Sequence, residues 1–180
     1  MSNARPPKGI VACAVPSLSV LDRRQIDAAY FHDSYRAPLS RGRASVVEVF
    51  FGVFGHHPKW MKIALVVRNR LASCCGLEVP TTAEIMRPQV RASYSVGEKI
   101  GPWPIFHLSE TELVAGRDNK HLDFRLSVLK ETIGEDSSAV VSTLCTTHNV
   151  FGKLYLALVI PFHRWGVKQL MSRAIAEGRL

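Results

Sequence analysis

A change in hydrophobic periodicity divides the first half of the chain into a strand and two helices. Residues 30–39 (YFHDSYRAPL) alternate between two faces and are rich in aromatic residues, which is typical of a β-strand. Residues 45–54 instead carry apolar side chains at helical spacing behind Ser45, a residue type that caps helices. Residues 58–75 repeat this spacing, with most Lys and Arg residues away from the apolar stripe. We therefore expect the second helix to be amphipathic and basic on its outer side.

The second half of the chain returns to a two-residue periodicity, which predicts a series of strands. Short polar turns separate these strands, and strands joined in this way form antiparallel sheets. The expected elements are a connection at 77–95, an aromatic strand region within 98–110, strands at 111–116, 121–130 and 139–148, and turns at 117–119 and 134–138.

The last predicted element is a long helix. Asn149 can cap a helix that runs from Val150 to about Ala176. Residues 154–160 (LYLALVI) are apolar all round, which predicts burial on most sides, and the run is too short to span a bilayer. Pro161 is expected to kink the helix or to remove one of its hydrogen bonds. An antiparallel sheet curved around this helix is the economical packing, so we expect an α+β fold.

Composition and charge restrict the class of protein. A chain of 180 residues with 47% hydrophobic and 21% charged residues suits one globular domain. We expect residues 1–25 to form a tail or early strand and residues 26–180 to form the domain. The net charge of +8 comes from scattered basic residues, so it is consistent either with an anionic partner or with general solubility.

The N-terminus and the cysteines indicate a cytoplasmic protein. The apolar stretch at 10–21 is similar to a weak secretory signal, but Pro16 interrupts it and no clear cleavage site follows. The four cysteines show no CxxC spacing, which favours reduced thiols over zinc ligands or a disulfide framework. His56 and His57 lack a third ligand nearby in the sequence, so no metal site is expected.

Two segments resemble a known bacterial family. HLDFR at 121–125 and THNVFGKLYLALVIPFHR at 147–164 resemble a family of uncharacterised domains that occur alone or behind a short-chain dehydrogenase-like domain. That family looks like a branch of the START/polyketide-cyclase (SRPBCC) helix-grip superfamily, over roughly residues 27–177. The resemblance implies a cavity between sheet and helix of the kind that receives lipids, sterols, polyketides or hormones. It implies no catalytic set and no cofactor, and any dehydrogenase would be a separate partner because no dinucleotide fingerprint occurs here.

The residues that we expect to bind a ligand in such a cavity are aromatic or ionisable. His121, Asp123 and Arg125 share one predicted strand face, where they suit an anionic head group or proton transfer, or alternatively a salt bridge on an outer face. Tyr155 and His163 are eight residues apart on one helical face, where they face either a ligand or partners on the sheet. The aromatic candidates either line the cavity or pack in the core. The full set is Trp60, Trp103, Phe106, His121, Asp123, Arg125, His148, Tyr155 and His163.

Three functions remain open. The leading prediction is binding of an apolar or amphipathic molecule (lipid, polyketide or isoprenoid-like), with Arg125 or a helix cation near its acidic end. The first alternative is a cyclase or dehydratase that uses one positioned acid or base in the same cavity. The second is a peripheral membrane or protein-interaction domain that uses the basic helix and the apolar helix. Nucleic-acid binding is not expected, because no recognised module is present.

Overall fold

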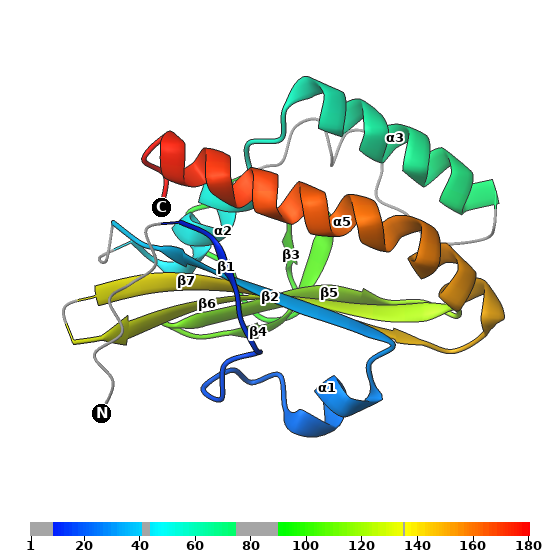
Figure 1. Cartoon of the computed structure of the whole chain (residues 1–180), viewed down its shortest axis with the longest axis horizontal. Helices are drawn as coiled ribbons and strands as arrows, with labels where there is room; N and C mark the ends of the chain where they lie inside the picture. Colours follow the sequence, from blue (N-terminus) through cyan, green and yellow to red (C-terminus); the bar gives the residue numbers. More distant parts are fainter. Residues whose placement is uncertain (1–8, 41–43, 75–89, 135) are drawn as a thin grey trace.

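The computed structural model describes residues 9–40, 44–74, 90–134 and 136–180 (Figure 1). Their strands form one seven-stranded antiparallel sheet with the order β1-β2-β7-β6-β5-β4-β3. The strands are β1 (Val11–Ala12), β2 (Phe31–Pro38), β3 (Lys99–Ile100), β4 (Trp103–Leu108), β5 (Glu112–Asp118), β6 (Leu122–Ile133) and β7 (Asp136–Thr147).

The described helices are α1 (Arg23–Ala28), α2 (Val46–Phe54), α3 (Lys59–Cys74) and α5 (Val150–Ala176). Three of the described helices, α1, α2 and α5, begin where a side chain accepts a hydrogen bond from a backbone N–H group of the first turn. Ser45 and Glu48 form a capping box at the start of α2, and the Asn149 side chain accepts a hydrogen bond from the Gly152 N–H at the start of α5. These caps confirm both predicted helix starts.

The sheet joins segments that are far apart in the sequence. Successive hairpins connect β4 to β5, β5 to β6, and β6 to β7. The next neighbour of β7 is β2, which pairs with it antiparallel from Phe31 opposite Cys145 to Pro38 opposite Ser138. The strand order therefore places β2, from the beginning of the chain, directly beside the strand that leads into α5.

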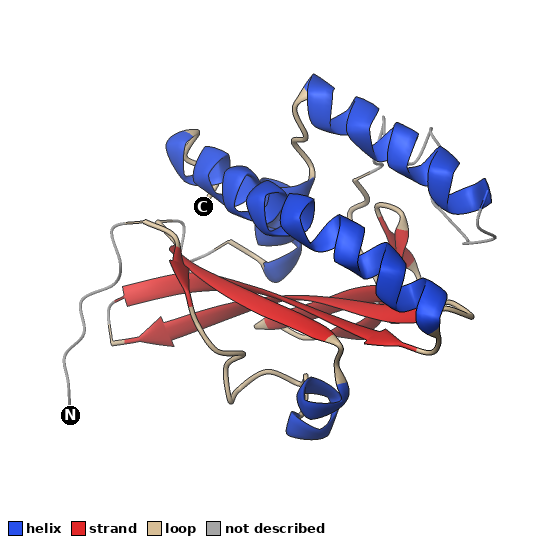
Figure 2. Ribbon diagram, turned by 45° about the vertical axis from the view of Figure 1, so that its right-hand side comes forward, coloured by secondary structure: helices blue, strands red, loops and turns tan. Residues whose placement is uncertain are grey.

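Helices cover the two faces of the sheet unequally (Figures 1 and 2). Helix α5 crosses one face with α2 beside it, α3 lies on the same side but further from the sheet, and α1 lies on the opposite side. The main core lies between the sheet and the α2 and α5 helices, where Val49, Phe50 and Met171 are almost fully buried. This packing confirms the α+β class and the antiparallel sheet with a C-terminal helix.

The opposite face of the sheet is covered by the N-terminal segment. Leu21 packs against Val114 and Leu144 there. The buried Glu112 carboxylate accepts hydrogen bonds from the Ser19 hydroxyl at 2.6 Å and from the Val20 N–H at 2.8 Å. Within residues 1–25, therefore, β1 extends the sheet and the following segment closes its second face.

Three expectations about individual segments are wrong. The predicted turn at 117–119 begins later, because Arg117 and Asp118 continue β5 and pair with β6. The predicted turn at 134–138 is shorter, because β7 already begins at Asp136. The apolar run at 154–160 is not buried on most sides, since Leu154 and Leu158 are 64% and 67% exposed where no described segment covers that face.

The structure also contains a short helix, α1, that the sequence did not predict. Helix α1, which a capping box at Asp22 begins, is too short to show a helical pattern in the sequence. The helix α5 is continuous across Pro161. Most of the connection expected at 77–95 lies outside the described residues. In the part of the chain that the structure describes, no helix is both long and apolar enough to cross a membrane.

Candidate functional site

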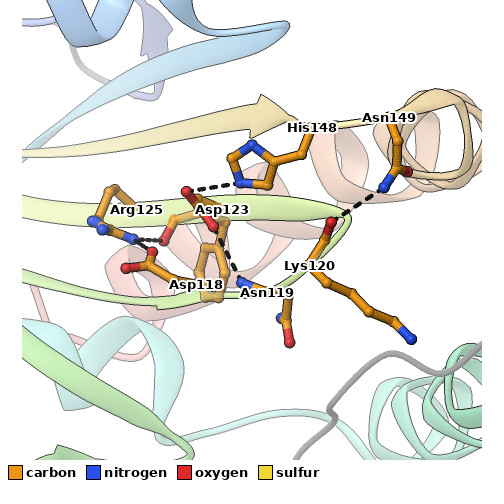
Figure 3. Close-up of polar contacts among 8 residues, drawn as sticks. Asp118, Asn119, Lys120, Asp123, Arg125, His148 and Asn149 are labelled. Atoms are coloured by element: carbon orange, nitrogen blue, oxygen red, sulfur yellow. Dashed lines mark hydrogen bonds and ion pairs between the residues drawn. The ribbon is translucent and has the colours of Figure 1, made fainter.

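Four of the predicted ligand-binding residues lie where the β5–β6 turn approaches the start of α5, and Figure 3 labels three of them, Asp123, Arg125 and His148. Nε2 of His148 lies 3.0 Å from Oδ2 of Asp123, whose other oxygen accepts a hydrogen bond from the Asn119 N–H at 3.1 Å. Arg125 pairs with Asp118 on the neighbouring strand. The structure thus brings Asp123, Arg125 and His148 together, on the side of β6 away from α5.

The fourth residue, His121, belongs to the hydrogen-bonded contacts between this turn and the start of α5. The Asn149 side chain donates to the Lys120 carbonyl at 3.1 Å, and its amide lies within hydrogen-bond distance of His121 Nδ1. The His121 carbonyl accepts a hydrogen bond from the His148 N–H at 2.9 Å. Because these polar groups satisfy one another, the cluster is explained as the junction that holds the helix start against the sheet.

A second polar group lies beneath α5, on the face of the sheet that the helix covers. Nε2 of His163, from α5, lies 3.3 Å from Oδ1 of Asp33 in β2. Only 10% of the Asp33 side chain and 22% of the His163 side chain are exposed. Since an ionised carboxylate only accepts hydrogen bonds, the imidazole N–H is the donor. This pair joins the helix to the sheet in a largely buried setting.

Two hydroxyl groups lie on the same face as the Asp33–His163 pair. Thr143 stands opposite Asp33 across the β2–β7 ladder, and Tyr35 is two residues further along β2. The Asp33 Oδ2 and Thr143 Oγ1 atoms are both buried and have no hydrogen-bond partner among the described residues. Burial, and then the charge of the Asp33 carboxylate and a hydrogen bond between the two side chains, raise the pKa of Tyr35 to about 12.

The surroundings of this pair are apolar, apart from Arg164 and Lys168 of α5, whose cations lie over the Phe31 and Tyr35 rings. Toward the start of α5, Leu156 packs with Phe31 and with its neighbours on β6 and β7. Toward the end of α5, Val167 and Met171 belong to the main core. The His163 ring also meets the Phe31 ring edge to face, with centroids 5.6 Å apart. A few polar groups within an apolar lining are typical of a site that binds a small molecule.

The other candidates lie in different surroundings. Trp103 is a core residue that meets Phe50 and Phe124 edge to face. The Phe106 ring, on the far side of β4, supports the Arg125 guanidinium at 3.7 Å. Tyr155 is half-buried against the cluster around Leu156. Trp60 is 43% exposed on α3.

The described segments contain no assembled set of metal ligands. No group of three or more His, Cys, Asp or Glu side chains there is arranged to hold a metal ion. A surface groove of about 1280 Å³ lies over the start of α2, between Ser45, Tyr94 and Glu110. It contains none of the predicted ligand-binding residues.

Three residues of the group beneath α5 do not follow from the sequence interpretation: Asp33, Tyr35 and Thr143. The signal for Asp33 is present in the alternation of residues 31–37, where Phe31, Tyr35 and Ala37 share its face. A single carboxylate on an otherwise apolar strand face is unusual, because burial of an unpaired charge is costly. Its partner could not be found in the same way, since His163 is 130 residues distant in the sequence.

Fold and site together define a small α+β domain whose antiparallel sheet carries a buried polar pair beneath its C-terminal helix. The chain belongs to the family described as "Protein of unknown function (DUF2867)", whose model matches residues 25–170. This match confirms that the chain is a member of an uncharacterised domain family. No curated protein and no solved structure matches it significantly.

Proposed function

We propose that this domain binds an apolar small molecule with one hydrogen-bonding end, held between the sheet and α5. The observation that carries the proposal is the Asp33 carboxylate. Nine-tenths of that side chain is buried, one oxygen is paired with His163, and the other has no hydrogen-bond partner among the described residues. A buried acceptor without a partner costs about 1–3 kcal/mol, and more when it is charged, so a ligand that donates to Oδ2 recovers that free energy on binding.

The neighbouring hydroxyls narrow the chemistry of the ligand. Asp33 only accepts hydrogen bonds, whereas Thr143 and Tyr35 can also donate. A hydroxyl or amine on the ligand would satisfy Asp33, and a hydroxyl would also satisfy Thr143. An alcohol of lipid, polyketide or isoprenoid type therefore fits better than a molecule with an acidic end. Of the cations expected near such an acidic end, Arg125 lies on the other face of the sheet and pairs with Asp118. The helix cations Arg164 and Lys168 lie over the Phe31 and Tyr35 rings.

The fold is compatible with this function. We propose that it is a variant of the helix-grip fold, in which a curved antiparallel sheet and a long C-terminal helix enclose a ligand. The START/polyketide-cyclase resemblance of residues 121–125 and 147–164 supports that assignment. The apolar packing beneath α5 forms two clusters, on either side of the Asp33–His163 pair, which agrees with a ligand whose polar end lies at the pair and whose apolar body extends along one of the clusters.

The same pair favours a second candidate function, an acid–base enzyme of cyclase or dehydratase type. A carboxylate that orients an imidazole is a usual arrangement for a general base, and the protonated Tyr35 hydroxyl could act as a hydrogen-bond donor to the substrate. An enzyme would lose turnover in an His163→Gln variant that still binds the molecule. A binding module would show no turnover of the bound molecule in either protein.

Native mass spectrometry of the full-length protein, with organic extraction of any bound molecule, tests the proposal. The protein is then offered a fatty alcohol, a sterol, an isoprenoid alcohol and an aromatic polyketide. We expect one of these classes to bind, and we expect Asp33→Asn to weaken binding about tenfold or more, the value of a hydrogen bond to a charged group.

Asp123→Asn is the matched control, because Asp123 also pairs with a histidine but lies at the junction of Figure 3. It should leave binding unchanged, and circular dichroism should show that both variants fold. Absence of an adduct together with no uptake from the panel would contradict the proposal. Equal loss of binding in both variants, or loss in Asp123→Asn alone, would show that the ligand does not bind at Asp33.

A further inference from the structure

The face of α5 that points away from the sheet is apolar and exposed. The exposed side chains follow one another at helical spacing of three or four residues, so they form a continuous stripe. The stripe consists of Phe151, Leu154, Leu158, Phe162 and Trp165, each more than half exposed. Large exposed apolar patches on a folded domain are typical of surfaces that bind another protein, a membrane or a ligand.

Helix α3 continues this surface. Its exposed apolar side chains are Trp60, Ile63 and Val67, again at spacings of three and four residues. The expectation that the outer side of this helix is basic, with its apolar stripe buried, is therefore wrong for these three residues. The rings of Trp60 and Trp165 lie 4.8 Å apart, which joins the two stripes. Figures 1 and 2 both show α3 and α5 on the same side of the sheet. We call the two stripes together the outer helix face.

The charge of the protein is concentrated on these same two helices. The segments Lys59–Cys74 and Val150–Ala176 contain eight Lys and Arg residues and no Asp or Glu. The whole chain has 23 basic and 15 acidic residues, so the rest of the chain is electrically balanced and the two helices account for the entire net charge of +8. Among these basic residues, Arg70 and Lys153 are exposed, whereas the cations of Arg164 and Lys168 turn back over the Phe31 and Tyr35 rings of β2.

We propose that the outer helix face docks on an anionic lipid bilayer. Exposed Leu, Phe and Trp side chains flanked by Lys and Arg are the pattern of helices that lie in the membrane interface, where the apolar groups enter the acyl boundary and the cations meet lipid phosphates. Two tryptophans on this face agree with the preference of Trp for that region. This attachment is peripheral and uses the folded domain as a whole.

Charge is the reason to prefer a bilayer over a second copy of the chain. A two-fold dimer through the outer helix face would bring two identical sets of cations together, with no acidic residue on either helix to pair with them. An anionic bilayer accommodates both the apolar stripe and the cations. The inference is independent of the proposed ligand, because Asp33 lies on the opposite side of α5 from the stripe.

Co-sedimentation of the full-length protein with vesicles tests this proposal. The vesicles are phosphatidylcholine alone, or phosphatidylcholine with about one third phosphatidylserine. We expect binding to the anionic vesicles only, weakened by salt, with a blue shift of the tryptophan fluorescence. The double variant Leu158→Ser with Phe162→Ser should reduce binding more than tenfold, since each removes a large apolar side chain from the interface.

Matched variants distinguish binding through the outer helix face from nonspecific adsorption of the protein to vesicles. Arg70→Gln and Lys153→Gln should each weaken binding about fivefold. Arg24→Gln on α1 and Leu18→Ser in the N-terminal segment change equally exposed residues on the other side of the sheet, and they should have no effect. Asp33→Asn should also leave vesicle binding intact, which keeps this test distinct from that of the ligand.

Two results would overturn the proposal. One is failure to bind the anionic vesicles at low salt. The other is binding that the Leu158→Ser and Phe162→Ser substitutions do not change. If light scattering instead finds a dimer that this double variant dissociates, and vesicles do not bind, the outer helix face is a contact between copies and the bilayer assignment is wrong.

Discussion

His57 lies between α2 and α3, where it is partly buried. Burial is the main cause that lowers its pKa from 6.5 to about 4, and the charges of Lys62 and His56 add to the effect. The folded protein therefore holds His57 neutral over a pH range in which the unfolded chain protonates it. Because the unfolded state binds more protons there, stability falls as the pH is lowered from about 6.5 to about 4.

We expect this single residue to contribute about 3 kcal/mol to the loss of unfolding free energy across that range, at 1.36 kcal/mol for each pKa unit. A His57→Gln variant, measured by urea denaturation at several pH values, should show a smaller loss toward acid pH than the native protein. His56→Gln changes the exposed neighbour and should keep nearly the native slope. A native slope in His57→Gln would show that the residue is not buried as described.

Buried polar residues are also where sequence interpretation is weakest. Glu112 and Asp33 are both acidic residues in strands, and their sequence neighbours give no sign of a partner. Glu112 is bonded to Ser19, 93 residues earlier, and to Ser127 on the next strand. Such partnerships depend on which strands become neighbours, and the strand order could not be read from periodicity. For the same reason, the sequence indicated His163 but not its partner Asp33.

At the scale of an element, α5 shows both what a pattern predicts and what it omits. Its bounds follow from local features, the Asn149 cap and the long apolar repeat, and both were predictable. The side of the helix that faces the sheet was not predictable, because residues 154–160 are apolar in every direction and provide no polar side. The two halves therefore differ, with a buried core side near Met171 and an exposed stripe near Leu158.

Two glycines of α5 should respond to the same substitution with opposite signs. At Gly152, an added Cβ would lie 2.2 Å from the His121 carbonyl oxygen, so Gly152→Ala should lower the unfolding free energy by at least about 2 kcal/mol. At Gly166, the closest atom would be Met61 Cε at 3.7 Å, an ordinary contact. Gly166→Ala should therefore raise the unfolding free energy by about 0.5–1 kcal/mol, the difference in helix propensity.

Chemical denaturation of the two variants compares these effects directly. The substitution is identical and both sites are in one helix, so a general effect of alanine on α5 is excluded. Equal stability of Gly152→Ala and the native protein would mean that the helix start is not held against the β5–β6 turn as Figure 3 shows it.

At the scale of the whole molecule, the N-terminal segment is part of the fold because it closes the second face of the sheet. Leu21 is 4% exposed against Val114 and Leu144, whereas Leu18 is 77% exposed three residues earlier. Sequence interpretation did not predict this role, since residues 10–21 lack a clear periodicity and residues 1–25 were expected to form a tail or early strand.

Leu21→Ala should therefore lower the unfolding free energy by about 2–5 kcal/mol, as for other leucines removed from a core. Leu18→Ala should change it by less than about 0.5 kcal/mol, the usual effect of a surface substitution. Thermal unfolding of both variants measures the contrast. Similar small effects would show that the segment is not packed on the sheet.

The pairing of β2 with β7 has a consequence for how the protein is made. β2 leaves the ribosome at least 100 residues before its partner at Ser138–Cys145, which belongs to the last strand of the sheet to be synthesised. Until then, the edge and apolar face of β2 have no native neighbour, and an unpaired strand edge is a template for incorrect pairing. Contacts between such distant residues also form slowly. Folding of the sheet should therefore wait until β7 has been synthesised, and the nascent domain should depend on chaperones until then.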